Sequence, residues 1–184
     1  MLWFLISALL ILIDQLTKLW VLASPVLMNG GRITIIDGFF HIIYTLNRGA
    51  ALSFLADRSW GIYVLTAISF LVGITVAVLL WRQRSGMKLF AMTLSLILAG
   101  TVGNLIDRVR LGGVVDFLDF QFGSWHFPTF NVADSCLTIG AFLLIILFMT
   151  HGDRIEHELQ KPGVAFTGSS PVVSGETVDT HDDV

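Results

Sequence analysis

The stretch FNVADSCLTIGAFLLIILFM, residues 130–149, places three chemically active side chains directly before a long apolar run. Asn131, Asp134 and Cys136 stand together, and residues 137–149 carry no charge. Such a run forms most of a helix that crosses the roughly 30 Å hydrocarbon core of a bilayer. Three interpretations of the polar residues are open: the thiol carries chemistry, the carboxylate does, or the group only starts a helix.

The helix-start interpretation needs no chemistry. Asn131 suits the N-cap position, and Asp134 then falls at N3, where a carboxylate favours the positive end of a helix. For Cys136 we expect a packing role, because no histidine is placed by the sequence to activate its thiol. The five histidines, at positions 41, 126, 151, 157 and 181, show no metal-binding spacing, and we predict no metal and no cofactor.

The composition indicates a membrane protein. Hydrophobic residues make up 54% of the 184 and charged residues 14%, whereas soluble domains carry about 25% charged residues. Four segments are long and apolar enough to span a bilayer: about residues 1–22, 60–81, 89–106 and 133–150. The first is not typical of a cleaved signal peptide, because it lacks a positive start and is interrupted by Asp14 and Lys18.

Four spans place both chain ends on one side of the membrane. The numbers of Lys and Arg in the loops on the two sides are equal, so their density has to decide the orientation. The very short second loop is the densest in cations and lacks acids; its basic residues are Arg82, Arg84 and Lys88. We therefore predict that this loop and both termini are cytoplasmic. The net charge of −3 gives no indication of nucleic-acid binding.

The first and third loops predict structure of their own. RITIIDGFFHIIYTL (32–46) has two β-rich runs around an Asp-Gly pair, a hairpin signal. ALSFLADRSW (51–60) predicts a short interfacial helix, and VVDFLDFQFGSWHFPTF (114–130) predicts strands whose aromatic residues rest on the bilayer surface. We divide the chain into a membrane domain, 1–150, and a tail, 151–184, which starts with a polar helical stretch and ends in a segment expected to be disordered.

Nearly all polar residues inside or beside the spans fall at one membrane face. In the spans they form three groups at helical spacing: Asp14 with Lys18, Asn104 with Asp107 and Arg108, and Asn131 with Asp134. Asp116 and the pair Asn47-Arg48 lie in the loops at the same face. The topology alone brings them to this face. A charge in a span costs about 2.5–3.5 kcal/mol and is a functional hypothesis by default, although Asp14 and Lys18 equally suit a merely neutralising pair.

Two interpretations from other classes are open at this point. A small proton- or ion-coupled transporter would use Asp14, Lys18 and Asp107 as a relay, but it predicts polar groups spread through the membrane depth. A membrane assembly factor without enzymatic activity would use the acids only as helix caps. The chargeless second and third spans and the one-sided polar set disfavour the transporter.

Taken together, the polar blocks closely resemble bacterial lipoprotein signal peptidases, the type II signal peptidases. The matching blocks are DQLTK (14–18), NRGAALSFL (47–55), GNLIDRVRLGGVVDFLDF (103–120) and FNVADS (130–135). Their order and spacing agree, and the resemblance covers about residues 1–150. Ala99-Gly100-Thr101 replaces a form richer in Gly and Ala, a departure that concerns packing.

The resemblance implies an intramembrane aspartyl endopeptidase that removes signal peptides from prolipoproteins, cutting before a cysteine that carries diacylglycerol. The implied catalytic pair is Asp116 and Asp134. The residues that match the polar lining of the family site are Asn47, Asn104, Arg108 and Asn131, and those that match supporting positions are Asp14, Lys18 and Asp107.

The implied fold is four transmembrane helices with a small extracytoplasmic β-cradle and an interfacial helix. The resemblance places the protein in the bacterial inner membrane with its site near the outer face. We expect a monomer that acts on lipidated prolipoproteins within membrane lipid.

Two carboxyl groups suit this reaction, because a close pair shares one proton and so supplies a base and an acid together. Such a pair titrates as a unit, and neither Asp116 nor Asp134 is permanently the acid. Asp134 starts the fourth span. Asp116 follows Gly112-Gly113, and we expect this segment to be flexible enough to swing Asp116 against Asp134.

Overall fold

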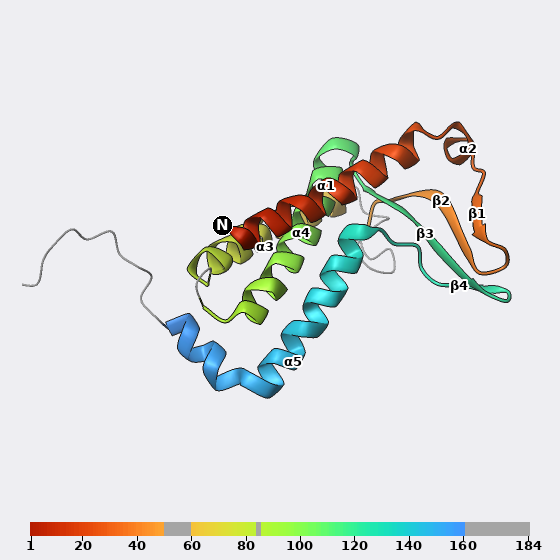
Figure 1. Ribbon diagram of the computed structural model, residues 1–184. Helices are drawn as coiled ribbons and strands as arrows, with labels where there is room; N and C mark the ends of the chain where they lie inside the picture. Colours follow the sequence, from red (N-terminus) through yellow and green to blue (C-terminus); the bar gives the residue numbers. More distant parts are fainter. Residues whose placement is uncertain (50–59, 84–85, 161–184) are drawn as a thin grey trace, which may run out of the picture.

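Four long helices dominate the computed structural model, which describes residues 1–49, 60–83 and 86–160. They are α1 (Leu2–Ala23), α3 (Gly61–Arg82), α4 (Lys88–Leu111) and α5 (Val132–Gln160), and a single-turn helix, α2 (Pro25–Met28), follows α1 (Figure 1). All four long helices have the length and the hydropathy needed to cross a membrane. The fold class predicted from the sequence is confirmed.

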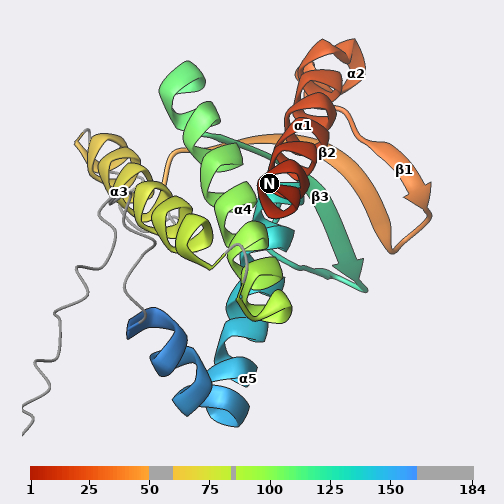
Figure 2. The same cartoon turned by 60° about the vertical axis from the view of Figure 1, so that its left-hand side comes forward.

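Helix α4 is the centre of the bundle. It packs against α1, α3 and α5 (Figure 2), and 61% of its span is buried, whereas at most 22% of each other span is buried. Small residues on α4 allow this crowding; the buried ones include Ser95, Ala99, Gly100 and Gly103. Close approach of helix backbones across small residues is typical of membrane bundles. The helix that carries Asn104 and Asp107 is therefore held from three sides.

Helix α1 is polar on its packed face and apolar on its outer face. Its buried residues are Ser7, Asp14, Lys18 and Val21, a spacing that follows one stripe of a helix. The leucines on the outer face, such as Leu5 and Leu9, are more than half exposed. This arrangement suits a helix surrounded by lipid, because apolar side chains gain nothing by turning inward there.

A four-stranded antiparallel sheet lies at one end of the helices, in the order β1 (Ile33–Ile36), β2 (Phe40–Asn47), β3 (Val114–Phe122) and β4 (Trp125–His126) (Figure 1). The predicted hairpin is confirmed: Gly38 turns between β1 and β2 with φ of 68°, a region that favours glycine. Strand β2 pairs with β3, and Thr45 lies opposite Asp116.

The end of α4 controls where the sheet begins. The helix ends at Leu111 rather than near residue 106, because Gly112 takes the left-handed conformation with φ of 66° and stops it. Strand β3 starts two residues later, and a small core fixes the sheet to the ends of α1 and α2; its buried members are Val21, Leu27, Ile42, Val115 and Phe117. The start of β3 is thereby fixed on both sides.

Two predictions concern the ends of the loops and of the chain. The interfacial helix predicted at 51–60 lies, except for Trp60, outside the described residues, as does the end of the tail. The polar helical stretch after Thr150 is present: α5 continues past a kink at His151. Beyond the kink, Ile155 is fully buried in the core shared by α3, α4 and α5.

The contact between α4 and α5 provides a first test. A Cβ added at Gly100 would overlap the carbonyl oxygen of Ala133 and lie 2.6 Å from Cγ of Leu137. We expect Gly100→Ala to destabilise the protein by about 1–3 kcal/mol through overpacking, seen as a lower melting temperature in detergent. The control is Gly73→Ala, where the nearest atom is Cγ2 of Thr101 at 3.7 Å. Equal melting temperatures of the two variants would contradict this packing.

Candidate active site

Asp116 is held in the middle of a paired strand. It is 2% exposed, and both of its carboxylate oxygens accept hydrogen bonds: Oδ2 from Nδ2 of Asn47 at 3.1 Å and Oδ1 from Nδ2 of Asn131 at 2.7 Å. Two donors on a buried carboxylate offset much of the cost of removing it from water. The expectation that Asp116 swings on a flexible segment is wrong, since strand pairing with β2 fixes its backbone.

Asp134 stands in the first turn of α5. Its N–H donates to Oδ1 of Asn131 at 2.8 Å, so Asn131 is the side-chain cap of the helix, as the sequence predicts. Its carboxylate accepts from Nδ2 of Asn104 at 2.7 Å. The helix start is thus a rigid support for a half-buried carboxylate that lines a pocket.

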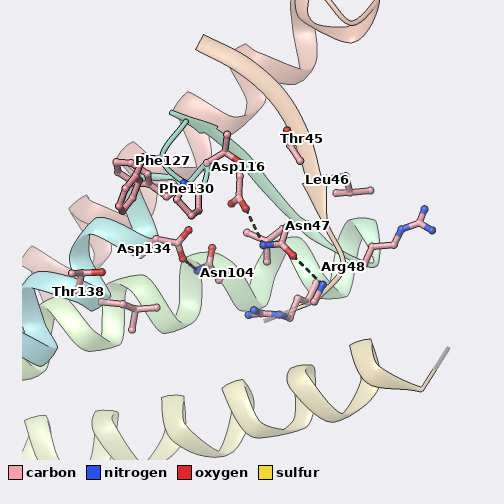
Figure 3. A pocket seen from close by; sticks show the side chains of 16 residues that line it. Thr45, Leu46, Asn47, Arg48, Asn104, Asp116, Phe127, Phe130, Asp134 and Thr138 are labelled. Carbon is pink, nitrogen blue, oxygen red and sulfur yellow. Dashed lines mark hydrogen bonds between the residues drawn. The ribbon is translucent and has the colours of Figure 1, made fainter. Parts of the chain in front are cut away.

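Two asparagines connect the two carboxylates. Asn131 caps α5 with its oxygen and donates with its nitrogen to Asp116 and, at 3.2 Å, to Oδ1 of Asn104. Asn104 in turn donates to Asp134. The chain of contacts therefore runs from Asp116 through Asn131 and Asn104 to Asp134. Figure 3 shows its last contact, between Asn104 and Asp134.

The Lys18 ammonium lies beneath this chain. Its Nζ is 2.9 Å from Oδ2 of Asp14, 2.9 Å from Oδ2 of Asp107 and 3.1 Å from Oδ1 of Asn104. The side chains of the three charged residues are at most 2% exposed. Because an ammonium has three N–H donors, Lys18 uses all of them on three different residues. It is a shared counter-ion for two acids and also orients Asn104.

The two acids bound to Lys18 use their other bonding capacity on backbone groups next to the proposed catalytic residues. Oδ1 of Asp14 accepts from the N–H of Ala133 at 2.9 Å, which ties α1 to the first turn of α5. Oδ2 of Asp107 accepts from the N–H of Val115 at 3.1 Å, which ties α4 to β3. Each acid thus fixes the residue immediately before one of the two aspartates, a supporting role beyond that of a neutralising pair.

Arg108 and Asn47 border the same space. Nη1 of Arg108 donates to Oγ of Ser69 on α3 at 3.2 Å. Nε of Arg108 is buried and has no hydrogen-bond partner among the described residues. Oδ1 of Asn47 accepts from the N–H of Gly49 at 3.0 Å, which holds its amide toward Asp116. Arg108 and Asn47 thus both bring side-chain N–H donors to the border of this space.

Both aspartates line one pocket of about 810 Å³, together with Asn47, Asn104 and Arg108. Figure 3 shows Asp116 and Asp134 on its wall together with aromatic and small side chains. The lining residues are Thr45, Leu46, Asn47, Arg48, Gly49, Asn104, Arg108, Val114, Asp116, Phe127, Pro128, Thr129, Phe130, Asp134, Leu137 and Thr138. Burial, and then the negative charge of Asp134, raise the pKa of Asp116 to about 6, against the lowering effect of its two asparagine donors. Asp116 therefore keeps a proton at a pH where an ordinary aspartate has lost it.

The structure brings together every site residue that the sequence predicts. Asp116, Asp134 and the four lining positions border the pocket or, for Asn131, bond to residues that do. Cys136 is buried and does not occur among the described residues that line the pocket, in accord with the packing role expected for it.

Two contributors were missed by the sequence analysis. Nε2 of Gln15 donates to Asp14, Asp107 and the carbonyl of Gly103 at 3.1–3.2 Å. Gln15 stands inside the DQLTK block, so its position beside two charged residues was an available signal. Ser69 offered only a weak signal, because it is one of several hydroxyl side chains in an apolar span.

Known proteins are similar to this chain in sequence. A sequence model of the family described as signal peptidase (SPase) II matches residues 6–150. A lipoprotein signal peptidase of Cupriavidus taiwanensis is 43% identical over 147 residues, which are 79% of this chain and 81% of the relative. One of Burkholderia multivorans is 45% identical over 145 residues, 78% of this chain and 84% of the relative.

Solved structures agree with the sequence comparison. A bacterial membrane enzyme solved by the in meso method at 2.3 Å has a TM-score of 0.68 at 31% identity, over 80% of this chain and 87% of that one. A second, at 1.9 Å, has a TM-score of 0.67 at 31% identity, over 81% and 93%. Fold, site and relatives define a multi-pass membrane enzyme of the aspartic peptidase class. More narrowly, the chain belongs to the signal peptidase II family. The transporter and assembly-factor interpretations are set aside.

The ion triad, formed by Lys18, Asp14 and Asp107, provides the second test. Lys18→Met leaves Asp14 and Asp107 buried without their shared cation, and breaking a buried pair costs about 3–5 kcal/mol. We expect a large fall in melting temperature in detergent and loss of peptidase activity. The control is Arg110→Gln, an exposed cation that contacts Gln15 at 3.3 Å and whose loss should change stability by about 0.5 kcal/mol or less. A Lys18→Met protein that melts like the wild type would contradict the role of the triad.

Proposed function

We propose that this protein removes signal peptides from diacylglyceryl-modified prolipoproteins, cutting the peptide bond before the lipidated cysteine with Asp116 and Asp134 as the catalytic pair. Membership of the signal peptidase II family supports the substrate class. One observation carries the assignment of the pair: both aspartates line one pocket and are joined through Asn131 and Asn104.

The pair works with one shared proton. The ionised carboxylate takes a proton from a water molecule as the water oxygen attacks the carbonyl carbon of the scissile bond, while the protonated carboxyl donates toward the carbonyl oxygen. The carbon–nitrogen bond then breaks, and the leaving amine receives a proton from the carboxyl that accepted one from water. As the carbonyl re-forms, a hydroxyl of the tetrahedral intermediate returns its proton to the second carboxylate. The signal peptide leaves with a new carboxyl group and the lipoprotein with a free amino group, and the pair ends as it began.

The asparagines keep this pair in place and leave the proton free to move. Asn47 and Asn131 donate to Asp116, and Asn104 donates to Asp134, so each carboxyl has at least one amide donor fixed to it. Donors that do not titrate keep the geometry constant while the carboxyl groups exchange roles. Arg108 lines the pocket, and its guanidinium carries N–H donors for a carbonyl oxygen of the substrate backbone, which needs partners where lipid supplies none.

The position of the pocket suits a lipidated substrate. The pocket opens where the sheet meets α4 and the first turns of α5, and the aromatic residues Phe127 and Phe130 line it together with Leu137 and Thr138 of α5. We propose that signal peptide and diacylglyceryl chain enter from the lipid between these elements. The helices beside the pocket expose apolar side chains to that lipid.

We further propose the orientation in the bacterial inner membrane. The basic residues of the short loop between α3 and α4 favour a cytoplasmic position for that loop. Both termini would then be cytoplasmic, and the sheet and pocket would lie near the outer face. We propose that the protein acts there as a monomer, because the residues of the proposed mechanism all come from one chain.

Substitution of either aspartate tests the pair. Asp116→Asn and Asp134→Asn should each lower cleavage of a diacylglyceryl-modified lipobox peptide by about 10²–10⁴-fold, the usual contribution of acid–base catalysis. The melting temperature in detergent should show that both variants are folded. Asp37→Asn, in the exposed turn between β1 and β2, is the matched control and should cleave like the wild type. Normal cleavage by either Asp116→Asn or Asp134→Asn excludes the pair.

The pH dependence is a separate test. Since the pKa of Asp116 is raised to about 6, the substrate-free pair loses its shared proton as the pH rises through that value. We expect kcat/KM to fall above a pH of about 6. The fall in kcat should come at a higher pH, because bound substrate displaces water and disfavours ionisation further. A kcat/KM that keeps rising from acidic to mildly alkaline pH would contradict a shared proton.

A further inference from the structure

A second set of titratable groups lies in the sheet, outside the proposed mechanism. Asp119 of β3 is 4% exposed and stands between two histidines. Nδ1 of His126 is 2.9 Å from its Oδ1, and Nδ1 of His41, directly opposite in the strand register, is 3.6 Å from its Oδ2. None of the three residues lines the 810 Å³ pocket, and none contacts Asp116 or Asp134.

Only one of the two histidines makes a hydrogen bond. A carboxylate accepts and does not donate, so Nδ1 of His126 carries the hydrogen. At 3.6 Å His41 is beyond hydrogen-bond distance, and its ring nitrogens have no partner among the described residues. In the described part of the chain, His126 is therefore the one side chain that hydrogen-bonds Asp119. The bond joins β4 to a buried point of β3.

His126 is also the last residue before the wall of the active-site pocket. The four residues that follow it, Phe127, Pro128, Thr129 and Phe130, all line that pocket. The next residue is Asn131, which caps α5 and donates to Asp116. A backbone displacement at His126 would therefore move the pocket wall first.

This wall has open space on both sides. Phe127 and Thr129 line the active-site pocket and also a second cavity of about 580 Å³, which Asp119 and His126 border as well. Four backbone bonds hold the two ends of the wall to β3. At one end the N–H of Phe127 donates to Phe120 at 2.8 Å; at the other the N–H of Phe130 donates to Leu118 at 3.3 Å, and the carbonyl of Phe130 accepts from Phe117 and Leu118 at 3.0 and 2.9 Å. One of the four lies at the His126 end, where Phe127 borders empty volume on two sides and Pro128 has no N–H to add another.

We infer that His126 is a positioning residue for substrate binding: its hydrogen bond to buried Asp119 fixes the wall, residues 127–130, against which the substrate packs. The inference rests on the proposed function of the pocket. The wall contacts the substrate in the ground state and in the transition state alike. Loosening the wall therefore weakens binding of both states equally, which raises KM and leaves kcat nearly unchanged.

Two substitutions at one position test the bond. His126→Ala removes the donor and should raise KM for a diacylglyceryl-modified lipobox peptide about three- to tenfold, the factor for one net hydrogen bond, with little change in kcat. His126→Asn places an amide N–H close to the position of Nδ1 and should restore KM to near the wild-type value. If His126→Ala is not recovered in folded form, His126→Asp takes its place. It matches Asn in shape, lacks the N–H and should show the raised KM.

The matched control lies in the same hairpin. Gln121 pairs with His126 in the strand register, and its side chain bonds the carbonyl of Gly123 at 2.8 Å rather than Asp119. Gln121→Ala should leave KM unchanged. The inference is overturned by a wild-type KM in His126→Ala, by a loss confined to kcat, by failure of Asn to rescue, or by an equal rise in Gln121→Ala. Activity retained in Asp116→Asn would instead overturn the proposed function, so the two failures are distinguishable.

Discussion

A lysine ammonium buried among membrane helices is expensive unless its charge is matched and its donors are used. In this protein Lys18 meets Asp14, Asp107 and Asn104, one from its own helix and two from α4. The two acids then reach Ala133 and Val115, the backbone neighbours of Asp134 and Asp116. One ion triad therefore fixes α1, α4, α5 and β3 to one another at the point where the pocket forms. The remaining geometry of the site depends on it.

Neutral amides carry the connection from the triad to the proposed catalytic pair. Asn104 bonds Lys18 with its oxygen and Asp134 with its nitrogen, and Asn131 bonds Asp116 while capping α5. An amide keeps both a donor and an acceptor at every physiological pH. The protonation of the two carboxyl groups can thus change while the amide hydrogen bonds that position them persist. A pair of carboxyl groups that exchange a proton requires this. Asn131 therefore both caps α5 and positions Asp116.

Much of this arrangement was predictable from the sequence, and the rest was not. The apolar runs predict the four helices, the Asp-Gly turn predicts the hairpin, and the motif blocks select Asp116 and Asp134. The predicted swing of Asp116 was wrong, because strand pairing with β2 is set by tertiary contacts rather than by the glycines before it. The contacts of Gln15 and the bond between His126 and Asp119 join residues whose proximity depends on packing, which local patterns do not contain.

The central claim is that Asp116 and Asp134 titrate as one pair. Infrared spectroscopy of the protonated carboxyl stretch, followed as a function of pH, measures this directly in the wild type and in Asp134→Asn. Because the charge of Asp134 contributes to the raised pKa of Asp116, the account predicts that Asp116 in the variant loses its proton at a lower pH than in the wild type. An unchanged titration of Asp116 would contradict the account, since the two carboxyl groups would then act independently.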